Sequence, residues 1–433
     1  MKLNQALALG SVFVGLVATT HATNARVESM GKNTNFIMDD ISIFDNPANV
    51  GIYPNHLIGG FGNLTEEDVL NNITDPQNPQ FGGIFALGIG ADTDRDPKFL
   101  IGGLLNRKDA LLGYLPDQVI VPIEGLASQS EQIAVPTTVT NIDGFLGLST
   151  ESGNLFGAHI YTAVQDGISD DGTVDPRFYA SVLRFDLGTN FSFNEDIDWE
   201  ISAGVNRLHF GADDSDFFDV GEFGYSVETR MFSTLAALNG ELVPHLQYDY
   251  IQTFGRENTN LSMGLGVNVG MERGFFWLGV DYINFEEITE GWTKDEVTGS
   301  VTADQHPNNE NEYGNDFRTE TGAVVSFGIE RNIWVDWFVI RVGGQKKISW
   351  VECSPAEAED SRFDTSFCGE SGAYMSTNPV GNGTLEDHLG FGIGINIEEK
   401  LKVDATLAED LLFRNPFDGA PRFVSRISAT YSF

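Results

Sequence analysis

The sequence predicts an all-β fold, an antiparallel barrel whose strands cross a membrane. Three observations lead to this fold class. Apolar side chains alternate with small or polar ones through many segments of about ten residues, short connections take turns with long acidic ones, and an amphipathic segment ends on Phe433. A tilted strand of about ten residues spans the hydrocarbon layer of a membrane, and alternation turns one face to lipid and the other to the lumen.

The terminal segment, residues 422–433, has one mostly apolar and one mostly polar face, because successive side chains of a strand point to opposite sides. One face carries Phe423, Ser425, Ile427, Ala429, Tyr431 and Phe433, and the other carries Val424, Arg426, Ser428, Thr430 and Ser432. The segment resembles the terminal signal strand of bacterial outer-membrane barrels, whose last residue is characteristically Phe. We therefore predict that Tyr431 and Phe433 form the assembly signal. The alternative is an ordinary amphipathic strand in a soluble sheet.

The first residues have the features of a cleaved export signal. Lys2 supplies a positive charge, residues 6–18 form an apolar run, and Thr20-His21-Ala22 fits a small-x-small cleavage site. That run is too short to span a bilayer as a helix, and no later segment has about 20 apolar residues without a charge. We expect a signal peptide at residues 1–22 and no membrane helix. Export alone leaves a soluble periplasmic or secreted protein open.

The composition fits strands joined by tight turns. The chain has 48 Gly and 32 Phe but only 2 Cys, which excludes a disulfide-built module and a collagen-like repeat. Its net charge of −38 argues against nucleic acid as a partner, because binding phosphate requires clustered Lys and Arg. A mean hydropathy of −0.14 does not exclude a membrane barrel, since barrel strands expose apolar side chains only at alternate positions.

Residues 23–56 lack sustained alternation and have a turn-forming centre at Asp45-Asn46-Pro47. We predict that they form a folded plug and not a pair of strands. Asn46-Pro47 alone is equally well explained as a turn with an Asx-type side chain and a fixed φ.

Three parts of this segment resemble a known family. They are Arg26-Val27-Glu28-Ser29-Met30-Gly31, the acidic pair Asp39-Asp40, and Ile43-Phe44-Asp45-Asn46-Pro47-Ala48. Together they resemble the amino-terminal hatch of the FadL-like outer-membrane transporters. The chain departs from the family pattern after the Met, where Gly31-Lys32-Asn33 stands in place of Gly-Gly-Ala. The resemblance implies a barrel of about fourteen strands whose hatch plugs the lumen, and passive uptake of hydrophobic compounds such as long-chain fatty acids.

The resemblance also implies a set of hatch or gate residues in this chain. They are Phe36, Asp39, Asp40, Phe44, Asn46, Pro47 and Ala48. We expect the apolar members to present an apolar surface inside the lumen. We also expect Asp39 and Asp40 to pair with lumen arginines, which would hold the hatch in place.

The remainder, residues 57–433, is predicted as the barrel. In residues 261–271 the row of Leu, Met and Val alternates with Ser, Gly and Asn, and residues 198–206 and 388–397 follow the same rule. Candidate strands lie at 57–64, 82–92, 99–106, 143–149, 154–164, 178–193, 198–210, 224–238, 245–255, 260–271, 274–287, 318–330, 334–350, 385–397, 400–409 and 422–433. We expect about fourteen wall strands, with a range of 14–16, because residues 99–106 and 143–149 are also explained as loop or hatch.

The connections indicate which end faces the cell exterior. Short turns alternate with long acidic segments at 165–177, 211–223, 288–317 and 353–384, and outer-membrane barrels have short periplasmic turns and long outer loops. The loop at 107–142 contains the apolar stretch Leu111-Leu112-Gly113-Tyr114-Leu115. This stretch is expected to fold as a short helix over the barrel mouth or to lie against lipid, and a simple loop anchor explains it equally well. The family implies a first capture groove for apolar solutes there.

The two cysteines, Cys353 and Cys368, are predicted to form a disulfide within the outer loop at 353–384. The compartment is oxidising, and closing a loop of about fifteen residues stabilises the fold by roughly 3 kcal/mol in the chain-entropy model.

The sequence carries no sign of catalysis, and we predict that the protein is not an enzyme. It has no G-x-S-x-G motif, and its seven His residues are scattered, so we predict no catalytic residues, no metal site and no cofactor. His209, His245 and His388 are expected at lumen or loop positions. Charged residues are expected on lumen faces at Arg184, Glu200, Arg207, Asp281, Arg318, Glu320 and Arg341.

The sequence therefore favours a multi-pass barrel of the bacterial outer membrane that takes up hydrophobic molecules passively. One alternative is a FadL-like accessory barrel of a protein secretion machinery that transports no solute, and a second is a general diffusion porin. The expected partners are outer-membrane lipids, a hydrophobic small-molecule ligand, the barrel-assembly machinery and, under the first alternative, subunits of the secretion machinery.

Overall fold

A computed structural model gives the fold of the chain. It describes residues 24–61, 80–88, 98–107, 109–114, 118–122, 130–134, 140–167, 178–194, 196–212, 215–253, 256–289, 292–294, 301–303, 316–354, 372–375, 388–398, 400–407 and 424–433. The expected signal peptide at residues 1–22 lies outside these residues and stays a prediction.

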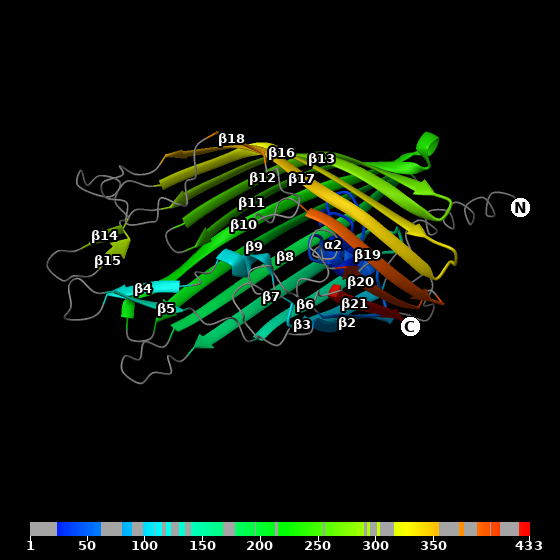
Figure 1. The fold of residues 1–433 in the computed structure, drawn as a ribbon. Helices are drawn as coiled ribbons and strands as arrows, with labels where there is room; N and C mark the ends of the chain where they lie inside the picture. The colour runs from blue at the N-terminus through cyan, green and yellow to red at the C-terminus, as the bar shows by residue number, and fades with distance from the viewer. Residues whose placement is uncertain are drawn as a thin grey trace, which may run out of the picture.

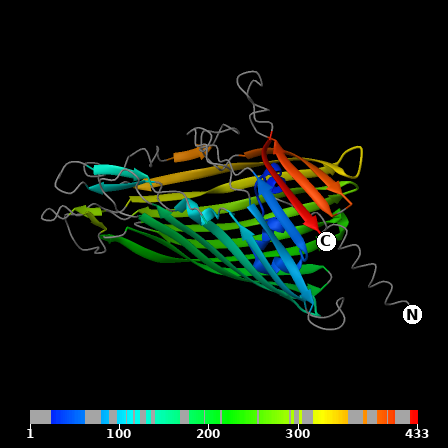
Figure 2. The same ribbon diagram turned by 90° about the horizontal axis from the view of Figure 1, so that it is seen from below.

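The chain forms an antiparallel sheet that closes on itself (Figures 1 and 2). The sheet has seventeen strands, and since β18 only extends the edge of β17, sixteen remain in the closed ring. Closure occurs where β1 pairs with both β2 and β21, with His56 opposite Ser432. The wall strands are β1 His56–Phe61, β2 Gln80–Gly88, β3 Lys98–Leu105, β6 Thr140–Ser149, β7 Leu155–Gly167, β8 Phe178–Asn194, β9 Ile197–Ala212, β10 Ser215–Leu235, β11 Gly240–Thr253, β12 Arg256–Met271, β13 Gly274–Thr289, β16 Asp316–Asn332, β17 Phe338–Ser354, β19 His388–Ile397, β20 Leu401–Leu407 and β21 Val424–Ser432.

The expected number of about fourteen strands is therefore wrong, and the wall has sixteen. The difference is the pair that was also explained as loop or hatch, because β3 pairs with β2 on one side and with β6 on the other. The expected long loop at 211–223 is also wrong, since β9 and β10 continue through most of it. Outside the ring lie β18 Gly372–Met375 and two small hairpins, β4 Gln118–Pro122 with β5 Ser130–Ala134 and β14 Trp292–Lys294 with β15 Val301–Ala303.

The two faces of the wall have opposite chemistry. Outward-facing side chains are large, apolar and exposed, such as Leu265 on β12 at 51% and Leu187 on β8 at 53%. Inward-facing ones are often charged and buried, such as Glu200 on β9 at 1% and Asp281 on β13 at 2%. A soluble sandwich buries its apolar rows against each other, whereas a membrane barrel turns them outward to lipid. The wall is therefore built as that of an outer-membrane barrel.

The terminal strand follows the predicted alternation. Ile427, Tyr431 and Phe433 are 43%, 42% and 57% exposed on the outward face, whereas Ser428 and Thr430 are 2% and 1% exposed on the inward face. Phe433 contacts Phe85 of β2, with ring centroids 6.0 Å apart, beside the seam where the ring closes. The wall thus ends on the aromatic pair that the sequence indicates.

In the part of the chain that the structure describes, five short helices accompany the strands: α2 Asn24–Ser29, and the 3₁₀ helices η1 Asp40–Ile43, η2 Pro47–Gly51, η3 Ala110–Tyr114 and η4 Ala236–Leu238. None of the helices among the described residues has the length and apolarity to cross a membrane. Residues 24–55, which hold α2, η1 and η2 and are called the amino-terminal segment below, lie inside the ring of strands (Figures 1 and 2).

The turns at one end of the barrel are short, and we call this the short-turn end. They lie at residues 150–154, 195–196, 236–239, 272–273, 333–337 and 398–400. The first residue of β1 and the end of β21 lie at this end too, since His56 pairs with Ser432. The opposite end, where η3 follows β3, is the long-loop end. In outer-membrane barrels short turns face the periplasm.

Candidate functional site: the barrel interior

Helix α2 docks on a part of the wall that has no side chains. The wall residues at this contact are Gly343 of β17 with Gly390 and Gly392 of β19. The space that a Cβ would need there is occupied by backbone atoms of Met30 and by atoms of Ser29. Because glycine lets two backbones approach closely, these positions form a seat that a larger residue would fill.

A chain of buried ion pairs fixes the same part of the segment to the wall. Arg26 binds Asp39 of its own segment at 3.1 Å and Glu330 of β16 at 2.6 Å. Arg341 of β17 also binds Glu330 at 2.6 Å, and reaches Asp404 of β20 at 2.6 Å. All five side chains are at most 6% exposed. Buried charges are tolerated when they are paired in this way, and removing one partner leaves the other uncompensated.

Wall side chains also satisfy the backbone of the segment. Asn268 donates to the Phe36 carbonyl at 2.7 Å, Thr406 to the Ala25 carbonyl at 2.8 Å, and Arg230 to the Thr34 carbonyl at 3.0 Å. A buried carbonyl without a partner costs free energy, so these bonds favour the docked position. They come from β10 and β12, which both pair with β11, and from β20 on another part of the ring.

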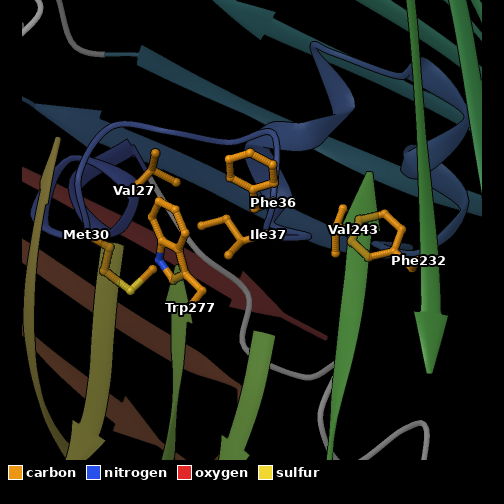
Figure 3. Close-up of a cluster of buried hydrophobic side chains, with 7 residues drawn as sticks. All are labelled: Val27, Met30, Phe36, Ile37, Phe232, Val243 and Trp277. Atoms are coloured by element: carbon orange, nitrogen blue, oxygen red, sulfur yellow. The ribbon is translucent and has the colours of Figure 1, made fainter. Parts of the chain in front are cut away.

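Two apolar clusters complete the contact. In the first, Val27, Met30, Phe36 and Ile37 pack against the wall residues Phe232, Val243 and Trp277 (Figure 3). In the second, Ile43, Val50 and Tyr53 pack against Ile84, Leu100 and Phe145 of the wall. Such inward-facing apolar residues interrupt an otherwise polar lumen face. Burial of one large apolar side chain contributes about 1.5–3 kcal/mol, so the clusters stabilise docking beyond the ion pairs.

Asp39 and Asp40 lie at the centre of the docked segment. Asp40 accepts a hydrogen bond from the Thr430 hydroxyl of β21 at 3.0 Å and is 1% exposed. Burial raises the pKa of Asp40 well above its usual range, and the adjacent Asp39 raises it further. Burial also raises the pKa of Asp39, against the opposing charge of Arg26. The expected pairing with wall arginines is not found, because Asp39 is bound by Arg26 of its own segment and Asp40 by a hydroxyl.

The Asn46-Pro47-Ala48 turn is built into the wall of β7 and β8. The Asn46 side chain accepts from the Ala48 amide at 3.1 Å and so caps η2, and it donates to the Thr189 carbonyl at 3.1 Å. Gly157 faces the Pro47 carbonyl so closely that a Cβ there would collide with it. The residue types that the sequence marks as a turn thus also make the contact to the wall.

Phe44 lies where the amino-terminal segment meets the long-loop half of the lumen. The Arg107 guanidinium lies 4.1 Å above its ring, and Phe145 lies 5.6 Å from it. Arg107 binds Asp143 at 2.7 Å and Asp109 at 2.8 Å. The contact therefore joins the segment to the loop that follows β3.

Helix η3 lies inside the long-loop half of the lumen. Its Leu111, with Leu112 and Tyr114, packs on inward-facing apolar side chains of β7, β8, β9 and β11, which we call the η3 patch: Tyr161, Ala163, Val182, Leu208 and Ile251. The stretch forms the short helix that was expected over the barrel mouth, packed on inward-facing side chains, and the alternative position against lipid is wrong.

Next to the η3 patch is a compact ionic cluster. His159 holds Asp143 with one ring nitrogen and Asp186 with the other, each at 2.8 Å. Arg184 binds Asp186 at 2.8 Å and lies 3.6 Å from Asp109. The imidazole of His159 on β7 thus links a carboxylate of β6 to one of β8.

Most of the expected lumen charges face inward. Glu200, Asp281, Glu320 and Arg341 are at most 5% exposed, and Arg184 and Arg318 bind inward carboxylates. The expectation is wrong for Arg207, which is exposed and lies over the outward-facing ring of Phe223 at 5.6 Å. Arg207 lies near the long-loop end of β9, where a long side chain can reach the polar membrane surface.

Two of the three expected histidines lie inside the barrel, whereas His209 falls in the outward-facing row of β9 with Val205 and Arg207. His245 binds Asp281, and His388 contacts the Glu28 carbonyl at 2.6 Å. No group of three or more His, Cys, Asp or Glu that would suit a metal ion occurs within the described residues. Cys368 lies outside those residues, so the disulfide with Cys353 stays a prediction.

Sequence reasoning missed several residues that hold the segment. Glu330, Asp404 and Arg107 carry the ion pairs, and Trp277 and Phe232 carry the first apolar cluster. One signal was present, since a charge or a large apolar residue at a lumen-facing position departs from the small or polar pattern. Which of these positions meet the segment depends on the docking geometry, which alternation does not give.

No family model matches the chain, and no curated protein matches it. Solved structures similar to it include the toluene transporter TodX of Pseudomonas putida, with a TM-score of 0.40 and 11% identity over 95% of this chain and 98% of that one. TodX is a FadL-family hydrocarbon channel.

Other similar structures are barrels of different kinds. CdiB from Escherichia coli has a TM-score of 0.41 and 11% identity over 88% of this chain, which spans only 63% of CdiB. BamA from Haemophilus ducreyi has a TM-score of 0.35 and 8% identity over 87% of this chain and 69% of that one. At identities and TM-scores this low, none of these likenesses assigns a substrate or a partner to this chain.

Proposed function

We propose that the chain is an outer-membrane transporter through which hydrophobic molecules pass inward by passive diffusion. In this proposal residues 57–433 form the barrel, and residues 23–56 form a hatch that plugs the lumen and yields to the solute. Long-chain fatty acids are the example that the family resemblance implies.

One observation carries the proposal: the amino-terminal segment fills the short-turn half of the lumen, and an apolar patch lies under η3 in the long-loop half. Phe36, Asp39 and Asp40 of the amino-terminal segment are at most 1% exposed. Beyond them, Tyr161 and Val182 of the η3 patch face inward and are fully buried under η3. A diffusion porin needs a water-filled, polar channel. An apolar patch on the long-loop side of a plug instead suits a hydrophobic solute.

The gate residues have separate roles in this proposal. Phe36 and Phe44 give the hatch its apolar contacts. Asp39 and Asp40 lie in its buried ionic centre. Asn46-Pro47-Ala48 forms the turn that anchors the hatch on β7 and β8. The outward apolar belt binds outer-membrane lipid, and Tyr431 with Phe433 is read by the barrel-assembly machinery during insertion.

The proposal is tested with a variant that lacks residues 24–50, compared with the full chain in proteoliposomes and in cells that lack the native gene. We expect the full chain to pass an apolar probe while retaining small sugars, and the assembled deletion variant to leak sugars or to lose control of apolar flux. Heat-modifiable migration on gels shows that the barrel is assembled in both.

An assembled deletion variant that neither leaks nor changes apolar uptake would contradict the hatch. In that case the accessory-barrel alternative gains weight, and capture of secretion-machinery subunits by the full chain becomes the decisive measurement.

A further inference from the structure

The turn between β16 and β17, residues 333–337, differs in composition from the other short turns at its end of the barrel. It reads Ile-Trp-Val-Asp-Trp and so holds two of the six Trp residues of the chain. The other short turns contain no aromatic residue; they lie at 150–154, 195–196, 236–239, 272–273 and 398–400. Trp334 is 86% exposed and Trp337 is 53% exposed, and Trp334 is the most exposed large hydrophobic residue of the described chain. The turn therefore presents a large aromatic surface to its surroundings.

The backbone at Trp334 is strained. Its φ is 64°, and the Val335 amide donates to the Ile333 carbonyl at 2.7 Å, which closes a three-residue turn around Trp334. Such a turn with a positive φ at its centre is rare, and a bulky side chain is unfavourable there because its Cβ crowds the backbone. Exposure of the ring to water adds a second cost, and contact with an apolar environment removes that cost.

The turn continues the lipid-facing surface of the barrel. The Trp337 ring contacts the Phe338 ring, with the two centroids 6.1 Å apart. Phe338 belongs to the outward row of β17, because the next residue, Val339, is buried on the inward face. Outward-facing apolar side chains adjoin the turn on both sides, since Ile329 of β16 is 39% exposed and Ile395 of β19, opposite Phe338, is 38% exposed. The aromatic turn is thus contiguous with the belt that faces lipid.

Charges of both signs surround the turn. Backbone hydrogen bonds of 2.8 Å, from Asn332 to Arg273 and from Asn396 to Trp337, place it between the two adjacent short turns. The exposed charged residues of these three turns include Glu272, Arg273, Asp336, Glu398 and Lys400. A zwitterionic phospholipid head group carries a phosphate and an ammonium, so a surface with both signs complements it and gives anionic lipid no advantage.

We propose that the turn at 333–337 anchors the barrel in the phospholipid interface at the short-turn end, with the rings of Trp334 and Trp337 at the level of the head groups. Trp favours this level because its ring is apolar while its N–H stays hydrogen-bonded to water or head groups. The anchor extends the lipid contact from the strands to one of their connections. It does not depend on the proposed transport function, and its test requires no solute.

The test uses the full chain, labelled with 5-fluorotryptophan, in nanodiscs of phosphatidylcholine. Fluorine NMR gives one resonance for each Trp, and Trp334→Phe and Trp337→Phe assign the two resonances of the turn. We expect a soluble nickel chelate to broaden these two several-fold less than it broadens free 5-fluorotryptophan. A phospholipid that is spin-labelled at its head group should broaden them strongly. Nanodiscs that also contain phosphatidylglycerol should give the same result.

A photoactivatable phospholipid with a diazirine next to its head group gives a second measurement in proteoliposomes. It should label peptides that contain residues 333–337, as mapped by mass spectrometry. The double variant Trp334→Gly, Trp337→Ser should lose most of this labelling and keep the labelling near Phe433, which is exposed on the outward face at the same end. Because Gly tolerates the positive φ at position 334, the variant should keep its heat-modifiable migration.

Three outcomes would overturn the inference. One is that the nickel chelate reaches both rings as freely as it reaches the free amino acid. Another is that labelling of the turn requires phosphatidylglycerol. The third is that both rings are exposed in lipid alone and become shielded only when a periplasmic extract is added, because the turn would then bind a protein and not lipid.

Discussion

Two non-strand pieces among the described residues lie inside this barrel, and they are held in very different ways. The amino-terminal segment, residues 24–55, has two apolar clusters, a chain of buried ion pairs and backbone carbonyls bound by side chains of β10, β12 and β20. Helix η3 has five residues, one apolar patch and one ionic anchor at Arg107 and Asp109. Both cover inward-facing wall residues.

The difference shows which piece a solute can displace without dismantling the lumen. Releasing the segment requires breaking contacts to many strands at once, whereas releasing η3 requires only the loss of its patch and of the Arg107 pairs. Elements with few buried contacts open at lower free energy than those with many. We infer that η3 opens often and that the segment opens rarely. The predictions below test this ranking.

The largest effect is expected from Arg26→Met. The substitution leaves Asp39 without its cation and removes one partner of Glu330, and breaking a buried pair costs about 3–5 kcal/mol. We expect amides of residues 24–55 to exchange hydrogen much faster while the strands stay protected. Hydrogen exchange with mass spectrometry measures this.

Arg273→Met is the matched control for that experiment. Arg273 lies 3.9 Å from Asp336 in side chains that are 51% and 88% exposed, and such surface pairs contribute little. Equal loosening of the segment in both variants would show that the buried ion chain does not hold it.

A smaller effect is expected from Arg107→Met. Arg107 binds Asp143 at 2.7 Å and Asp109 at 2.8 Å and lies over Phe44, and when Arg107 is lost Asp109 keeps Arg184 at 3.6 Å. We therefore expect η3 to become accessible to protease while residues 24–55 keep most of their protection. Limited proteolysis, with the cleavage sites mapped by mass spectrometry, distinguishes the two. Simultaneous release of both pieces would mean that they form one unit and would overturn the comparison.

The fold could be predicted largely from the sequence, because the side chains of a membrane-barrel strand face lipid and lumen alternately and the residue types follow that alternation. All sixteen candidate strands occur, and the rows around Leu265 and around Phe391 face as alternation requires. The count was set too low because β3 is rich in Gly and apolar residues on both faces, so its alternation is weak. Its place in the wall depends on pairing with β2 and β6, which no single strand reveals.

The interior was predictable in outline only. A turn at Asn46-Pro47 and an apolar, acidic segment follow from local residue types, and both are present. The partners of that segment do not follow, because Glu330 and Trp277 lie about 300 and 240 positions away in sequence from the residues they contact. In place of the expected lumen arginines, Asp39 binds a cation from within the segment itself and Asp40 accepts from the Thr430 hydroxyl of the wall.

A modest effect is expected from Asn46→Ala. Its side chain caps η2 by accepting from the Ala48 amide and donates to the Thr189 carbonyl of β8. Loss of an N-cap costs about 1 kcal/mol, so exchange at η2 should rise about fivefold while α2 is unchanged. Hydrogen exchange of the two helices in one sample measures the ratio. Loosening of α2 to the same degree would show that the segment opens as a whole and not from its turn.

The smallest effect is expected from pH. The raised pKa of Asp40 determines whether docking of the amino-terminal segment strengthens or weakens as the pH rises. Burial, and next the charge of Asp39, hold the pKa of Asp40 well above its ordinary value of 3.8, so the docked segment binds this proton more tightly than the released one. As pH rises above 3.8, the released state loses the proton first, and docking weakens until pH passes the raised pKa. Segment amides should therefore exchange more slowly at pH 5 than at pH 8, after correction for intrinsic exchange. Asp40→Asn keeps an acceptor for Thr430 without a titrating group, so it should reduce this dependence, and Asp39 should supply the remainder. A segment that is held more tightly at pH 8, or an unchanged dependence in the variant, would show that Asp40 is not the controlling group.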